Sequence, residues 1–189
     1  MKKITILFFI FPVLGAVIFY SFFYGNKNSP PANGQMSKFS LYGGISTVNN
    51  KAFWLDEGGK KYTLKDHNNK IVLINFWATW CAPCIKELPS IHRLNEILDS
   101  EYLTIIALNL DADRNKHKAK ELIAKLNLSG LDAFYDPDGS FADSVKVSVI
   151  PTTILFDRTG NELGRLIGSA DWGSPEALDL IKYFISKKQ

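Results

Sequence analysis

Residues 71–84 read IVLINFWATWCAPC, an apolar run that leads directly into a pair of cysteines. The continuous apolar run over residues 71–77 predicts a strand that is buried on both faces. Beyond the cysteines, apolar residues recur every three or four positions over the next 14 residues, which predicts a helix in spite of Pro89. Cys81 and Cys84 are therefore expected between a buried strand and the first turn of a helix.

This placement gives the cysteine pair its chemistry. A thiolate at a helix N-terminus is stabilised by unpaired backbone N–H groups and by the helix dipole, so Cys81 should be partly ionised near neutral pH. A disulfide across two residues closes almost no loop and stabilises little. A zinc site needs further ligands, and the chain has only two cysteines. The pattern favours a redox-active pair over a structural disulfide or a metal site.

The rest of the chain alternates between strand and helix patterns. Strands are expected over residues 102–110, 152–156 and 162–167, helices over 113–127, 141–145 and 175–185, and a hairpin over 52–55 and 60–64. Residues 134–135 are expected only as the approach to a turn at residues 136–139. Strands that alternate with helices, with a hairpin at one edge, indicate an α/β fold in which helices cover both faces of a mixed sheet.

The amino-terminal segment has a different character from the rest of the chain. Residues 4–24 contain no charge, follow two lysines and would span about 31 Å as a helix, roughly one hydrocarbon core. The run is longer than the apolar part of a typical signal peptide and ends without small residues, so we expect an uncleaved transmembrane anchor in residues 1–25. Cleavage is the alternative. A flexible tether in residues 26–36 and a folded domain in residues 37–189 would follow.

Charge and composition narrow the partners and the location. The 189 residues carry a formal net charge of +3 and are 46% apolar, which argues against a nucleic-acid binder and against a disordered chain. Two positive charges precede the apolar run, and the positive end of an anchor stays in the cytoplasm. The prediction is a single-pass protein of the inner membrane whose domain faces the periplasm or an equivalent space.

Residues 75–84, NFWATWCAPC, strongly resemble the thioredoxin superfamily. The continuation KELP at residues 86–89, the Ile150-Pro151 dipeptide and FDRTG at residues 156–160 are similar to its membrane-anchored TlpA/ResA-like branch. The resemblance covers about residues 37–187. It implies a thioredoxin-like fold and thiol–disulfide exchange, for which we expect neither a cofactor nor a metal.

The resemblance also implies roles for individual residues. Cys81 would be the exposed nucleophile that attacks a substrate disulfide, and Cys84 the buried thiol that resolves the mixed disulfide. Pro151 would be the cis-proline of the superfamily. Together with Ile150, it would offer backbone groups to an extended segment of the substrate.

Aromatic and proline side chains next to the cysteines complete the expected site. Trp80 directly precedes the first cysteine and is the better surface candidate, whereas Trp77 is expected in the core. Pro83 stiffens the turn between the two cysteines. We therefore expect Trp80 and Pro83 on the substrate-binding surface. Asp111, at the end of the second buried strand, is interpreted as a loop or helix cap.

Two polar residues near the cysteines bear on proton transfer, and of these Asn75 cannot titrate. Asn75 departs from cytoplasmic thioredoxins, which carry a buried, titratable Asp six residues before the first cysteine. Glu87 matches a Glu of the TlpA/ResA-like branch and lies one helical turn beyond Cys84, on the same helix face. Burial near a thiol should raise its pKa, which suits proton transfer, so we expect Glu87 to be catalytic. The alternative is an ordinary surface Glu.

The combined prediction is a membrane-tethered, extracytoplasmic thiol–disulfide oxidoreductase that reduces protein disulfides and is itself reduced by a membrane electron donor. In the branch that the chain resembles, typical targets are apocytochrome c and copper-delivery proteins. The sequence leaves the substrate, the direction of electron flow and the oligomeric state open. A copper-binding module that uses the same cysteines is the alternative class, although no histidine follows His117 to complete a site of that kind.

Overall fold

The computed structural model describes residues 29–41, 48, 52–98, 101–111 and 116–187. The predicted anchor and the first three residues of the predicted tether, 26–28, lie outside these residues. Within the described ranges, no helix is long and apolar enough to cross a bilayer. Met36, at the end of the predicted tether, closes a short 3-10 helix, η1 (Gly34–Met36), and is fully buried in the core.

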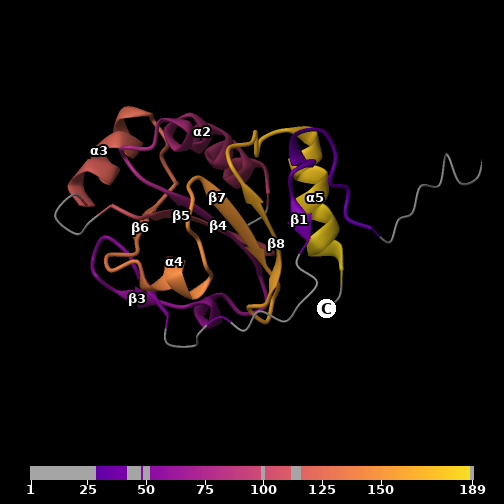
Figure 1. Ribbon diagram of the computed structural model, residues 1–189, viewed down its shortest axis with the longest axis horizontal. Coiled ribbons are helices and arrows are strands. Elements are labelled where there is room, and N and C mark those ends of the chain that lie inside the picture. Colours follow the sequence, from indigo (N-terminus) through magenta and orange to yellow (C-terminus); the bar gives the residue numbers. More distant parts are fainter. Residues whose placement is uncertain (1–28, 42–47, 49–51, 99–100, 112–115, 188–189) are drawn as a thin grey trace, which may run out of the picture. The chain divides into compact units, whose positions relative to one another are not determined.

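Within the described residues, eight strands form one mixed sheet in the order β1-β8-β7-β4-β5-β6-β2-β3 (Figure 1). They are β1 (Ser40–Leu41), β2 (Trp54–Leu55), β3 (Lys61–Tyr62), β4 (Ile71–Trp77), β5 (Leu103–Asn109), β6 (Ala133–Tyr135), β7 (Thr152–Phe156) and β8 (Glu162–Ile167). β4 is parallel to β5 and antiparallel to β7. The predicted mixed sheet is confirmed, and β4, the strand that leads to the cysteines, lies in its interior.

Helices cover both faces of this sheet, as expected. They are α2 (Ala82–Ile97), α3 (Lys116–Lys125), α4 (Ser140–Ser144) and α5 (Pro175–Ser186), together with the 3-10 helix η2 (Leu64–His67). Alternate side chains of β4 enter two separate cores: Leu73 belongs to the core that contains α2, α3 and α5, and Ile74 to the core that contains α4. All seven residues of β4 are buried, which is why its sequence is apolar except for Asn75.

Local signals in the sequence account for the helix ends that frame the site. α2 begins directly after Cys81 and continues through Pro89. α5 begins at Pro175, where the Ser174 hydroxyl accepts a hydrogen bond from the backbone N–H of Ala177. A serine N-cap followed by proline is a strong helix start, because proline needs no hydrogen-bond partner at that position.

The edge of the sheet beyond β5 differs in part from the prediction. β6 is a strand of three residues that pairs with β5 and β2, whereas the sequence predicts only an approach to a turn there. The hairpin is confirmed as β2 and β3, with Trp54 opposite Tyr62, and it extends the sheet because Leu55 pairs with Tyr135. Three residues are too few to show the alternating pattern of a strand, so the sequence of β6 carries no signal of its own. Its conformation depends on pairing with the neighbouring strands.

Candidate active site

The two cysteines lie where β4 gives way to α2. Cys81 is the N-cap residue of α2, and its Sγ accepts a hydrogen bond from the backbone N–H of Cys84 at 3.3 Å. The pair forms a disulfide, with 5.3 Å between the two Cα atoms. Because N–H groups at a helix start stabilise negative charge, the same amide can stabilise a Cys81 thiolate once the disulfide is reduced. Pro83 lies in the first turn of α2, between the cysteines.

Exposure around the pair is uneven. Cys84 is fully buried, as expected for a resolving thiol. The sequence predicts an exposed nucleophile, whereas Cys81 retains only 5% of its exposure in the disulfide. Trp80, one residue earlier, is 72% exposed and lies at the surface as expected, and Trp77 is fully buried. The neighbouring indole, rather than the sulfur itself, therefore dominates the accessible surface beside the pair.

Asp111 holds the segment that leads into the cysteines. Its carboxylate Oδ2 accepts a hydrogen bond from the backbone N–H of Thr79 and another from the Asn109 side-chain amide, both at 3.0 Å. The backbone N–H of Leu110 donates to the carbonyl of Trp77 at 2.8 Å. Asp111 is 3% exposed, so these contacts are shielded from water. The loop-cap interpretation of Asp111 is correct, and the loop that it caps is the one before Cys81.

Replacing Asp111 with alanine is expected to lower the free energy of unfolding of the full-length chain by about 2 kcal/mol or more, because the Thr79 amide loses a charged, buried acceptor. Urea denaturation measures this change. Asp132, also an aspartate but exposed, provides the matched control, and Asp132→Ala should change stability by less than about 0.5 kcal/mol. Equal losses in the two variants would contradict the role of Asp111.

Glu87 is buried at the centre of a hydrogen-bond network. Its Oε1 accepts from the backbone N–H of Ala170 at 3.0 Å and from the indole Nε1–H of Trp172 at 2.8 Å. Its Oε2 accepts from the side-chain amide of Asn75 at 3.1 Å. Glu87 is only 3% exposed, so the alternative of a surface glutamate is wrong. Cys84 lies one helical turn before it on α2.

Asn75 links Glu87 to the sheet. Its side-chain Nδ2 also donates to Thr153 Oγ1 at 2.9 Å, across the pairing of β4 with β7. Its Oδ1 is buried and has no hydrogen-bond partner within the described part of the chain. An amide can present either a donor or an acceptor to a neighbour, which a carboxylate at this position could not do once ionised. Asn75 therefore suits a neighbour that changes its protonation state.

Burial raises the pKa of Glu87 above its usual value of 4.5, because a charged carboxylate loses its contact with water. The hydrogen bonds from Ala170, Trp172 and Asn75 act in the opposite direction and lower the pKa, although by less. The expected elevation is thus present, and its cause is desolvation. A carboxyl group with a raised pKa beside a thiol pair is suited to accept and return a proton.

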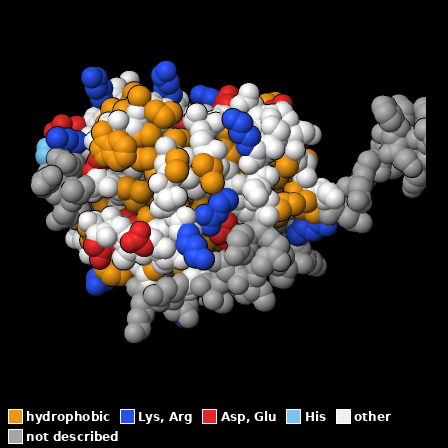
Figure 2. Space-filling model, viewed as in Figure 1, with side chains coloured by type: hydrophobic (Ala, Val, Ile, Leu, Met, Phe, Trp, Pro, Cys, Tyr) orange, Lys and Arg blue, Asp and Glu red, His pale blue; other side chains and the backbone are white. Residues whose placement is uncertain are grey.

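The peptide bond between Ile150 and Pro151 is cis, as the resemblance implies. The pairing of Phe76 with Thr152 places Pro151 at the end of β4 from which the chain runs to the cysteines. Val149 is 56% exposed, and Ile167, which pairs with Thr152, is 57% exposed. Hydrophobic side chains also gather over α2 and α3 on the face that Figure 2 shows. Exposed apolar side chains thus lie close to the proline, two residues before it in the chain and on the neighbouring strand β8.

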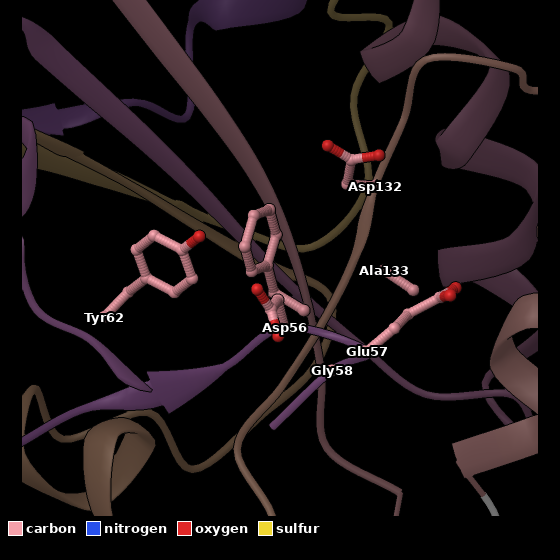
Figure 3. A pocket seen from close by; sticks show the side chains of 7 residues that line it. Asp56, Glu57, Gly58, Tyr62, Asp132 and Ala133 are labelled. Carbon is pink, nitrogen blue, oxygen red and sulfur yellow. The ribbon is translucent and has the colours of Figure 1, made fainter. Parts of the chain in front are cut away.

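The described part of the chain offers no cluster of metal ligands, and the pocket beside the hairpin is lined by none of the predicted site residues. No group of three or more His, Cys, Asp or Glu side chains that could hold a metal ion occurs among the described residues. A pocket between the hairpin and β6 is bordered by Asp56, Glu57 and Asp132, together with Tyr62 (Figure 3). It contains none of the predicted site residues.

Sequence reasoning missed Trp172 and Ala170, which lie more than 80 residues from Glu87 along the chain. The only available signal is a tryptophan within the polar stretch GSADWGS at residues 168–174. A large aromatic residue in such a loop is unusual unless it is buried.

Comparison with known proteins finds a matching family and related sequences. The model of the family described as Redoxin matches residues 33–181. The thiol-disulfide oxidoreductase ResA of Bacillus cereus is 34% identical over 113 residues, which cover 60% of this chain and 64% of that relative. The matched segment therefore spans less than two thirds of the relative.

Two solved structures have similar folds. The structure of a DsbF homologue from Corynebacterium diphtheriae is 26% identical, has a TM-score of 0.62 and covers 79% of this chain and 93% of that one. StoA from Bacillus subtilis is 20% identical, with a TM-score of 0.59, and the match covers 72% of this chain and 98% of StoA. At that identity, the second similarity concerns the fold alone.

Proposed function

Because this chain belongs to the Redoxin family, we propose that it is a membrane-tethered thiol–disulfide oxidoreductase that reduces disulfides in other proteins outside the cytoplasm. The thioredoxin-like fold, expected from residues 75–84, is confirmed. The similarity to the TlpA/ResA-like branch, expected from residues 86–89, 150–151 and 156–160, is confirmed as well. The observation that carries the proposal is the Cys81–Cys84 disulfide at the start of α2, one turn before a buried Glu87.

The proposed reaction begins with the reduced pair. The Cys81 thiolate attacks one sulfur of a substrate disulfide, which forms a mixed disulfide and releases the other substrate sulfur as a thiolate. The Cys84 thiolate then attacks Cys81 Sγ, which closes the Cys81–Cys84 disulfide and releases the second substrate thiolate. Two electrons have passed to the substrate, and a membrane-bound dithiol donor returns the pair to the reduced state. The hydrogen bond from the Cys84 amide to Cys81 Sγ supports the assignment of Cys81 as the attacking sulfur.

Glu87 supplies the proton transfer in this scheme. A buried Cys84 thiol must lose its proton before it attacks, and water has little access to it. Glu87 lies one turn away on the same helix, and its raised pKa brings it closer to neutral pH than an exposed carboxyl group. The ionised carboxylate takes the Cys84 proton and returns it to a departing thiolate.

The substrate would bind along the cis-proline segment. Its extended backbone would lie against Ile150 and Pro151, and its apolar side chains would contact Trp80 and Pro83. Exposed apolar surface beside a reactive pair is typical of a site that receives another protein. Residues 1–25 would anchor the chain in the inner membrane with the domain in the periplasm, where apocytochrome c or copper-delivery proteins are the target classes implied by the resemblance.

Replacing Cys84 with alanine in the full-length chain is expected to trap the substrate. Without a resolving thiol, the mixed disulfide at Cys81 persists, because the remaining route to its release is slow exchange with external thiols. Non-reducing electrophoresis of membranes that contain the variant should show an adduct that disappears on reduction, and mass spectrometry of the adduct names the partner.

The double variant Cys81→Ala/Cys84→Ala is the control and should capture nothing. Adducts that form equally well in this control would contradict the proposed site. A reduction potential of the wild-type pair near −120 mV, instead of about −270 mV as in thioredoxin, would contradict the reductive direction.

A further inference from the structure

One face of α2 is attached to the loop of residues 168–174, which joins β8 to α5. Glu87 accepts hydrogen bonds from Ala170 and Trp172, and Ser90 Oγ accepts one from the backbone N–H of Trp172 at 3.1 Å. One turn further on, Arg93 forms an ion pair with Asp171 at 2.9 Å. Glu87, Ser90 and Arg93 are spaced three residues apart, so they lie along one side of the helix. The loop is therefore held at three successive positions.

Trp172 makes the shortest hydrogen bond to the Glu87 carboxylate. Its indole Nε1–H lies 2.8 Å from Oε1, and its side chain is fully buried. An indole nitrogen can only donate, so this contact favours a charged acceptor over a neutral one. The other side-chain donor, Asn75, can turn its amide oxygen towards Glu87 instead. If Oε1 of Glu87 carried a proton, the Trp172 indole could not accept a hydrogen bond from it. Of the two side-chain partners, Trp172 is thus the one that cannot exchange its donor for an acceptor.

We propose that Trp172 is a positioning residue for disulfide exchange, whose indole N–H orients the Glu87 carboxylate and favours its ionised form. The loop of residues 168–174, held by Ser90 and by the Arg93–Asp171 ion pair, keeps the indole in place. This inference rests on the proposed role of Glu87 as the proton acceptor for Cys84. It adds a hydrogen-bond donor that lies outside β4 and α2, the two elements that carry Asn75, Glu87 and the cysteines.

Few other ionisable groups on the surrounding elements could produce a pH dependence of exchange that would be mistaken for the titration of Glu87. β4 and β7 carry no ionisable side chain. On α2, Lys86 is exposed, Cys84 is one of the reacting thiols, and Arg93 is engaged with Asp171, the one ionisable side chain of the loop. His92 and Glu96 of α2 form a separate contact with each other.

Replacing Trp172 with phenylalanine in the full-length chain is expected to move the pH midpoint of disulfide exchange upward by about one unit or more. The buried carboxylate would lose one charge-assisted hydrogen bond, so Glu87 would ionise only at higher pH. The matched control is Trp54→Phe, because Trp54 is also fully buried but belongs to the core on the other face of the sheet. Its indole nitrogen has no hydrogen-bond partner among the described residues, so its loss should leave the midpoint unchanged.

A second measurement needs no tryptophan variant. In ¹⁵N spectra of the reduced full-length chain, the indole N–H resonance of Trp172 should move with pH as Glu87 titrates. The resonance of Trp54, which stacks on His67 in the other core, should be unaffected by Glu87→Gln. Glu87→Gln should abolish the movement of the Trp172 resonance. Two results would overturn the inference and leave the proposed function intact. One is disulfide exchange by the wild type with the same pH midpoint in Trp172→Phe and in Trp54→Phe. The other is a Trp172 resonance that still moves with pH in Glu87→Gln. Absence of exchange in the wild type would instead refute the proposed function, while the indole titration would still test the contact.

Discussion

Replacing Cys81 with serine is expected to reduce the rate of disulfide exchange by roughly 10⁴-fold or more, because a hydroxyl group is almost never ionised at neutral pH. The Cys84 amide, which lies 3.3 Å from Sγ, stabilises a thiolate but cannot make serine acidic enough to attack. Turnover of a disulfide-bonded protein by the full-length chain, supplied with a dithiol reductant, measures the loss.

The control for this variant is Cys84→Ser, which keeps the attacking sulfur. It should release one substrate thiol per chain and then stop, whereas Cys81→Ser should release none. Both variants lack the disulfide, so their free energies of unfolding are compared with that of the reduced wild type, which lacks it too. Residual turnover in Cys81→Ser close to that of the wild type would show that the Cys81–Cys84 pair is not the reacting group.

Replacing Glu87 with glutamine is expected to slow exchange roughly 10²-fold at neutral pH, because the buried Cys84 thiol loses its internal proton acceptor. The amide is close to the carboxylate in size and can still accept the Trp172 and Ala170 hydrogen bonds, so the packing should survive. Single-turnover measurements on the reduced chain separate the attack of Cys81 from the resolving step, which should be the slower of the two in the variant.

The same substitution should change how stability depends on pH. The raised pKa means that folded Glu87 holds its proton more tightly than the unfolded chain does. Its contribution to stability is fully present below the usual value of 4.5 and is lost as pH rises through the folded pKa. Glutamine does not titrate, so relative to the wild type the variant should gain stability as pH rises above 4.5, until the folded Glu87 is itself ionised.

The exposed Glu121 on α3 offers a matched control for this prediction. Glu121→Gln removes the same charge without removing a buried contact, so neither the exchange rate nor the pH profile of stability should change. Parallel pH profiles for wild type and Glu87→Gln in urea denaturation would contradict the buried, titrating carboxyl group. Equal resolving rates would remove Glu87 from the mechanism.

The strand–turn–helix unit around the cysteines could be predicted because its signals are local. The apolar run of β4, the break before Cys81 and the helical spacing after Cys84 all lie within 30 residues. Each signal depends on the conformation of its own segment, and periodicity and capping reveal that directly. The same is true of β7, β8 and α5, whose predicted extents agree closely with the observed ones.

The surroundings of Glu87 could not be predicted in this way. Its position on α2 follows from helical spacing, but its burial depends on Trp172 and Ala170, which approach only when the loop after β8 packs against α2. β6 likewise exists because β5 and β2 lie on either side of it. The sequence by itself determined where the cysteine pair lies, since a cysteine pair at a helix start is a local arrangement. Only the tertiary structure decided which groups surround the Glu87 carboxyl, because the desolvation and the hydrogen bonds that shift its pKa come from segments far apart in the chain.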